Sequence, residues 1–281
     1  MRVTFDSGVL DYACRPERFP KDPLANDLPK IKTNLADGRL EGFYSESMLT
    51  LEGIAKLDRA NVYSNTKINI SEEVSVENKS ELPENLQEHI SSEVYTKITS
   101  TFTVMQPERQ PLHREIVARA AAAKALGVRV LKNTPRIGSF GYNDPQKEFF
   151  LEIGEGEALS KWQNTAFKVS REIEARGVGI AQVKALGSGL VSGQRENWSD
   201  ALSNARDIHE ERAIQRAFAE WADAEAIASH IAYGIDCFCS RDFGKSSGSR
   251  SIFDRENRDW LTQTYGVKFV SLEDLLAVLQ N

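Results

Sequence analysis

Residues 223–242 read DAEAIASHIAYGIDCFCSRD. The first part predicts a helix that starts at Asp223 and ends at Gly234, because glycine is common just past the last helical residue. The apolar run after it, from Cys237 to Ser240, predicts a strand, and Asp242 follows that strand directly. Ligand sites in α/β sheets gather at the carboxyl ends of parallel strands. The stretch therefore predicts an acidic site at one edge of such a sheet.

Helix and strand signals alternate in the rest of the chain. Short apolar runs predict strands at 2–6, 128–131, 236–240 and 267–270, and helical patterns precede or follow them at 111–126, 255–265 and 272–279. Two further helices are expected at 197–220 and 220–233, after a break rich in small residues at 186–193. Repeated helix–strand pairs with short connections predict a central parallel sheet with helices on both faces.

Three more acids in the N-terminal segment are candidates for this site. Asp6 ends the first predicted strand, and residues 42–54 have a helical spacing of apolar residues that carries both Glu46 and Glu52. These two glutamates are six positions apart, so they point about 120° away from each other on a helix, at roughly 100° per residue. Only one of them is therefore expected to face a common site.

Clustered carboxylates require a counter-charge. Asp6, Asp223 and Asp242 would repel one another at one sheet edge, and a hard divalent cation such as Mg²⁺ or Mn²⁺ removes that repulsion. A water molecule on such an ion can attack a phosphodiester bond. Glu225 is expected to face solvent, and His230 is expected to pack against the sheet.

The same residues resemble those of the PIN domain family, which includes toxin-type ribonucleases. In that family an acid begins a helix, Gly-x-Asp follows, and a strand ends in Ser or Thr-x-Asp; here Asp223, Gly234 to Asp236, and Ser240 to Asp242 match this order. The resemblance covers residues 1–60 and 215–281. It implies a three-layer α/β/α fold and catalytic, metal-binding roles for Asp6, Asp223, Asp242 and Glu52. Glu52 is preferred because Leu49 to Glu52 match the family's apolar-Thr-apolar-Glu run, and Glu46 is the alternative. The resemblance also implies supporting roles for Ser240 and Asp236.

The segment between the second and third acids is much longer than a minimal PIN domain allows. Residues 61–214 are expected to form an inserted α+β region, packed on the core or extending it, with strands at 61–106, a basic helix and strand at 111–136 and helices at 157–214. The basic part is expected to hold the substrate backbone through Arg114, Arg129, Lys132 and Arg136.

Composition limits the remaining choices. The chain of 281 residues has a net charge of −6, which counts against a broad nucleic-acid surface, and has no apolar run that could span a membrane. Asp6 stands where a signal peptide would need an apolar segment, so no signal peptide is expected. The three cysteines lack the spacing of metal ligands, and we expect them to be reduced in a cytoplasmic protein.

The sequence thus predicts a metal-dependent endoribonuclease with RNA as its partner. An antitoxin or other regulatory protein and self-association into a homo-oligomer are further expected partners. The alternative is a catalytically inactive PIN-like module that acts in protein binding or assembly.

Overall fold

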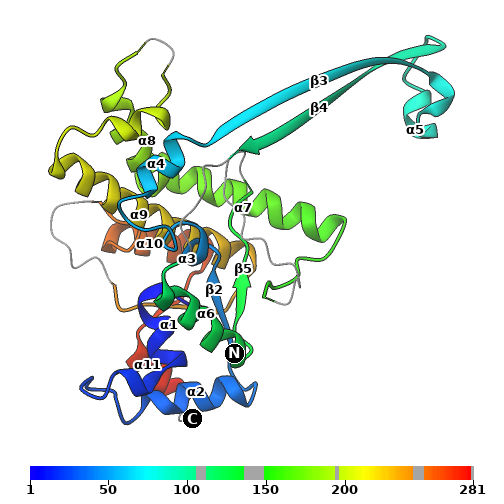
Figure 1. Ribbon diagram of the computed structural model, residues 1–281. Helices are drawn as coiled ribbons and strands as arrows, with labels where there is room; N and C mark the ends of the chain where they lie inside the picture. Colours follow the sequence, from blue (N-terminus) through cyan, green and yellow to red (C-terminus); the bar gives the residue numbers. More distant parts are fainter. Residues whose placement is uncertain (106–111, 136–148, 194–195, 243–249, 280–281) are drawn as a thin grey trace.

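The computed structural model describes residues 1–105, 112–135, 149–193, 196–242 and 250–279. Its centre is a five-stranded sheet in which all paired strands are parallel, in the order β5-β2-β1-β6-β7. Strands β5 and β2 lie side by side in Figure 1. The predicted α/β class with a central parallel sheet is therefore confirmed. The strands are β1 (Arg2–Phe5), β2 (Glu41–Ser45), β5 (Arg129–Leu131), β6 (Cys237–Cys239) and β7 (Phe269–Val270).

Alternation along the strands explains why both faces of the sheet are covered. Val3 and Phe5 of β1 pack into one core. Thr4, between them, points to the other face, where its hydroxyl lies 2.9 Å from Nδ1 of the buried His230. Burial lowers the pKa of His230 to about 3, so this histidine packs against the sheet as a neutral group, as the sequence predicts.

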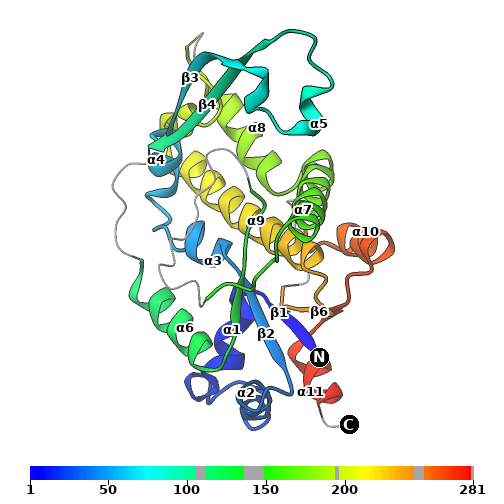
Figure 2. The ribbon, with the colours of Figure 1, turned by 90° about the vertical axis from the view of Figure 1, so that its right-hand side faces the viewer.

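Two helical layers enclose the sheet (Figure 2). Each layer has its own hydrophobic core, as expected for an α/β/α arrangement. The first layer is built from α1 (Ser7–Cys14), α2 (Leu28–Ala36), α6 (Arg114–Ala125) and α11 (Leu272–Val278). The second is built from α7 (Glu157–Ala175), α9 (Ile208–Ala232) and α10 (Arg255–Tyr265).

Helix α9 is one continuous helix of 25 residues, where the sequence suggested two helices that meet at residue 220. Asp207 caps it by accepting hydrogen bonds from the backbone N–H groups of His209 and Glu210, and neither proline nor glycine interrupts it. Its first half packs on α4 (Arg59–Ser64), α8 (Ile180–Leu190) and the 3₁₀ segment η3 (Asp200–Asn204). Asp223 therefore lies in the middle of a helix and does not begin one.

Two other sequence expectations need correction. Residues 41–45 form strand β2, although their segment was predicted as helix only, and the helical part is reduced to α3 (Ser47–Thr50). The expected break at 186–193 is helical up to Leu190, within α8. Glycine is required there because a Cβ atom on Gly187 would lie 2.1 Å from the carbonyl oxygen of Trp198.

Residues 61–214 contribute to more than one part of the fold. They supply β5 to the central sheet and helices α7 and α8, and they also form a separate antiparallel pair, β3 (Lys67–Asn78) and β4 (Val94–Met105). This pair leaves the body as a long arm (Figure 1), with the short turns η2 (Lys79–Glu81) and α5 (Glu84–Gln87) at its tip. No helix in the described ranges has the length and apolar character needed to cross a membrane.

Candidate functional site

Three of the expected acids line one small cavity at the carboxyl ends of the central strands. Asp6 follows β1, Glu52 lies just after α3, which continues from β2, and Asp223 enters from α9. Adjacent parallel strands end at the same edge of a sheet, so residues that follow them become neighbours. The cavity lining is completed by small and apolar side chains, among them Ser7 and Ala222.

A single hydroxyl group connects the first acid to the last. Ser240 follows β6 and is fully buried, and its Oγ donates a hydrogen bond to Oδ2 of Asp6 at 2.8 Å. The same Oγ accepts a hydrogen bond from the backbone N–H of Asp242 at 3.0 Å. The hydrogen bonding between the parallel strands β1 and β6 extends one residue further, because the backbone N–H of Asp6 donates to the carbonyl oxygen of Cys239 at 2.9 Å. Ser240 therefore orients Asp6 and places Asp242 beside it.

Of the two glutamates proposed for the site, Glu52 lies in the cavity. The hydroxyl of Ser7 donates to Oε1 of Glu52 at 3.0 Å, and the buried Arg59 donates to the carbonyl oxygen of the same residue at 3.2 Å. Glu46 is also buried, but its carboxylate accepts the backbone N–H of Asn133 at 3.0 Å, beyond β5. Glu52, and not Glu46, therefore lines the cavity together with Asp6 and Asp223.

The cavity acids raise one another's pKa values. Burial is the main cause for Asp6, Glu52 and Asp223, and the charge of a neighbouring carboxylate adds to it in each case. Asp223 is affected most strongly, since the charges of Asp6, Glu52, Glu220 and Asp242 all raise its pKa. This mutual effect places the four expected acids in one electrostatic group.

Glu220 is a fifth acid that the sequence reasoning missed. It lies three residues before Asp223 on α9, a spacing that puts both side chains on neighbouring positions of one helix face. Its carboxylate accepts a hydrogen bond from the backbone N–H of Ile252. Burial raises its pKa to about 7, with smaller contributions from Asp254 and Asp242. The i, i+3 spacing was a usable signal, but it was hidden by the helix boundary expected at residue 220.

Two acids near the cavity in sequence lie elsewhere in space. Asp236 was expected to support the site, but it precedes β6, and its carboxylate accepts the backbone N–H of Arg2 at 2.8 Å at the amino end of the sheet. Glu225 was expected to face solvent, but it is 4% exposed and accepts hydrogen bonds from the Thr134 backbone and the Trp221 indole. Of the two residues expected to support the site, Ser240 lies beside Asp6 and Asp236 lies at the other end of the sheet.

The expected phosphate-binding residues are spread over the fold. Arg129 begins β5 and pairs with Glu41 at 3.2 Å, at the start of β2, which places its charge toward the end of the sheet opposite Asp6. Lys132 follows β5, with its ammonium group 5.5 Å from the ring centre of Phe150. Arg114 is exposed at the start of α6, and Arg136 lies outside the described residues.

The donor set suits a hard divalent cation. Asp6, Glu52, Asp223 and Asp242 offer only carboxylate oxygens, the ligands that Mg²⁺ and Mn²⁺ prefer. Such an ion would offset the burial and the repulsion that together raise the pKa values of Asp6, Glu52 and Asp223. Within the described ranges, however, no three His, Cys, Asp or Glu side chains surround one point closely enough to hold a metal ion. The side chains therefore fit the chemistry of a metal site, and they would have to close around an ion.

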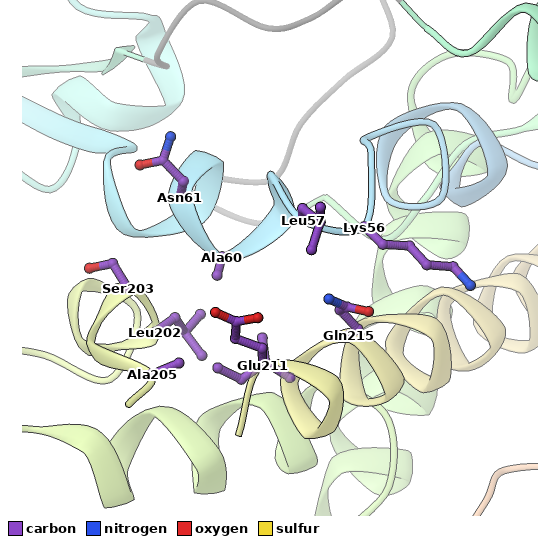
Figure 3. A pocket seen from close by; sticks show the side chains of 10 residues that line it. Lys56, Leu57, Ala60, Asn61, Leu202, Ser203, Ala205, Glu211 and Gln215 are labelled. Carbon is purple, nitrogen blue, oxygen red and sulfur yellow. The ribbon is translucent and has the colours of Figure 1, made fainter. Parts of the chain in front are cut away.

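A second hollow lies away from the acids, at the base of the arm. It is a groove of about 340 Å³ between α4, η3 and the first half of α9 (Figure 3). Leu57, which is 77% exposed, stands on one wall with Lys56, and Glu211 and Gln215 of α9 stand on the other. The mixed lining contains no cluster of acids, so the groove differs in chemical character from the acidic cavity.

Comparison of the chain with protein-family models, with curated proteins and with solved structures gave no match.

Proposed function

We propose that this chain is a PIN-like, metal-dependent endoribonuclease whose site is the acidic cavity. The observation that supports it best is the common position of Asp6, Glu52 and Asp223 around one cavity, with Asp242 tied to Asp6 through Ser240. These are the acids that the PIN resemblance selects, and they come from segments far apart in the chain. The parallel sheet that gathers them is of the α/β/α type that the resemblance implies.

The chain's own residues hold and orient the ligands. Ser240 fixes one oxygen of Asp6, and Ser7 fixes one oxygen of Glu52, so that the remaining oxygens can face the ion. When bound there, Mg²⁺ or Mn²⁺ would supply a water molecule of lowered pKa and would stabilise charge on the phosphate. Because the raised pKa values favour protonated acids, proton loss must accompany metal binding, and affinity for the ion should rise with pH.

The proposal is tested by cleavage of labelled RNA and single-stranded DNA with Mn²⁺. Asp6→Asn should abolish cleavage. Asp236→Asn is the matched control, because this aspartate lies at the other end of β6 and outside the cavity. RNA cleavage that persists in purified Asp6→Asn at the wild-type rate would refute the assignment. Loss of activity in both variants would point to a general effect on folding.

A second candidate is a PIN-like module that binds proteins without catalysis. It is favoured by the net charge of −6 and by the pairing of Arg129 with Glu41, which removes one expected phosphate contact from the site. No cleavage of RNA or DNA by the folded wild type with Mn²⁺ would favour this candidate. A cytoplasmic location, an antitoxin or other regulatory partner and a homo-oligomeric state belong to the proposal as further expectations.

A further inference from the structure

The β3–β4 arm has one apolar face and one polar face. Strands β3 and β4 pair over twelve residues each, and directly opposed residues share a face. On one face, apolar side chains with exposed fractions of 46–70% recur along the arm, interrupted by the pair Glu72 and Ser100 and by Thr96 and Asn78. The opposite face carries mostly serine, threonine, asparagine and charged residues at the intervening positions, with Tyr95 and Met105 as its larger side chains. We call the first face the apolar strip; its exposed members are Ile70, Val74, Val76, Val94 and Ile98.

Exposure of such a strip to water is unfavourable, so we expect another surface to bury it. A lone two-stranded hairpin is marginally stable at best, and large exposed apolar patches mark interaction sites. The arm extends away from the helices and the central sheet (Figure 1), so the body of its own chain does not cover it. The cover must come from another molecule.

The charge of the arm argues against a nucleic acid as the molecule that covers the strip. Residues 67–105 contain seven acids and three lysines, a net charge of −4, so the arm does not attract a phosphate backbone. Of the charged residues in β3 and β4, Glu72 lies on the apolar strip and the others lie on the polar face. An apolar, nearly uncharged strip is complementary to a second strip of the same kind.

We propose that the arm is the dimerisation element of this protein, and that two copies pack their apolar strips face to face in antiparallel orientation. The paired arms then form a small two-layer β-structure that buries the apolar side chains of both strips and leaves Glu72 at its open, solvated side, because β3 and β4 are both edge strands. A two-fold axis across the middle of the strips lets the same surface serve both subunits. This arrangement also protects the strips from open-ended association.

The size of the strip indicates a second contact. Twelve residues at roughly 3.4 Å each give an arm of about 40 Å, and two strands about 4.8 Å apart give a width of about 10 Å with side chains, so the footprint is about 400 Å². A stable interface needs about 800 Å² from each partner. Full antiparallel overlap brings the tip of each arm to the base of the other.

Features at the two ends of the arm suit this second contact. The tip exposes Leu86, flanked by Glu84 and Glu88. The base holds the groove with exposed Leu57 and Lys56 (Figure 3). The tip can place Leu86 against Leu57 and its acids beside Lys56, on the wall of the mixed groove that lies opposite Glu211. The tip of each arm would thus occupy the groove of the partner subunit.

Sedimentation velocity measurements on the full chain test the proposal. The wild type should sediment as a dimer, with twice the chain mass of 31.4 kDa, at micromolar concentration. Val74→Lys combined with Ile98→Lys places two charges at an opposed pair of the strip and should weaken the dimer at least about 100-fold. Ser71→Lys combined with Thr101→Lys is the matched control, an opposed and exposed pair on the polar face, and should remain dimeric.

A cross-linking measurement keeps the test valid if a charged variant misfolds. Glu72→Cys, near the middle of the strip, should form a disulfide-linked dimer under mild oxidation, whereas Ser71→Cys, on the polar face, should not. A monomeric wild type at 100 μM would overturn the proposal and leave the strip to a different protein. Equal cross-linking of both cysteine variants, or a dimer unaffected by the strip lysines, would also overturn it.

Discussion

Replacing Glu220 with glutamine should change how the stability of the metal-free protein depends on pH. The pKa of this carboxyl group is raised from 4.5 to about 7, first by burial and then by Asp254 and Asp242. A group that is easier to protonate in the folded state makes the protein less stable as pH rises from its unfolded pKa to its folded pKa. The wild type therefore loses stability between pH 4.5 and about 7, whereas Glu220→Gln does not lose this contribution.

The size of the effect follows from the shift. A difference of 2.5 pKa units corresponds to about 3 kcal/mol, and partial solvent screening of this half-buried side chain reduces it to about 1–3 kcal/mol. For a chain of this length, with an unfolding entropy of roughly 0.6 kcal/mol/K, the melting temperature should differ by about 2–5 °C. Glu220→Gln should thus gain that much on the wild type between pH 4.5 and pH 8.

Thermal unfolding followed by circular dichroism, with EDTA present, is the assay. Glu211→Gln, an exposed acid earlier on the same helix, is the control and should follow the wild type at each pH. If the difference in melting temperature between wild type and Glu220→Gln stays constant from pH 4.5 to pH 8, burial beside the other acids does not raise the pKa of Glu220. The electrostatic description of the cavity would then be wrong.

Four further predictions follow from the cavity and the fold. Millimolar Mn²⁺ should raise the melting temperature by about 4–5 °C at 100 times its Kd, and Asp223→Asn should lose most of that gain in the same thermal scan. Ser240→Ala should lower the free energy of unfolding by about 1–3 kcal/mol in a denaturant titration. It should also weaken Mn²⁺ binding in calorimetry more at pH 6 than at pH 8, because Asp6 loses a hydrogen bond that lowers its pKa. Arg129→Gln should leave RNA affinity unchanged in a filter-binding assay, since its charge is engaged at the other end of the sheet. Gly187→Ala should destabilise the protein by several kcal/mol in urea titration, because a Cβ would meet a backbone carbonyl oxygen, whereas Gly189→Ala on the same helix has open space and should gain up to about 1 kcal/mol.

The sequence predicted the central sheet well where short apolar runs stood alone between turn signals. Strand β2 was missed because Phe43 and Tyr44 run directly into the helical spacing around Met48 and Leu51. Both faces of β2 are buried, so the strand lacks the polar alternation that would have separated it from the helix that follows. Periodicity alone does not distinguish a buried strand from a buried helix in so short a run.

The acids of the candidate site were predictable because strand ends and spacing select them. Asp236 was misplaced because two acids that flank a three-residue strand are close in sequence, yet they lie at opposite ends of the sheet. Glu225 was misread because the burial of a helix face depends on what packs on it, and here Trp221 and the segment after β5 cover it. Tertiary packing decided both cases, and local sequence does not contain it.

The central claim is that four carboxylates from separate segments hold one divalent cation. Crystals grown with millimolar Mn²⁺ and measured at the manganese absorption edge test it most directly. We expect an anomalous peak between Asp6, Asp223 and Asp242, with ligand oxygens at about 2.0–2.6 Å and Glu52 bound directly or through water. Well-ordered carboxylates without a peak among them would contradict the claim.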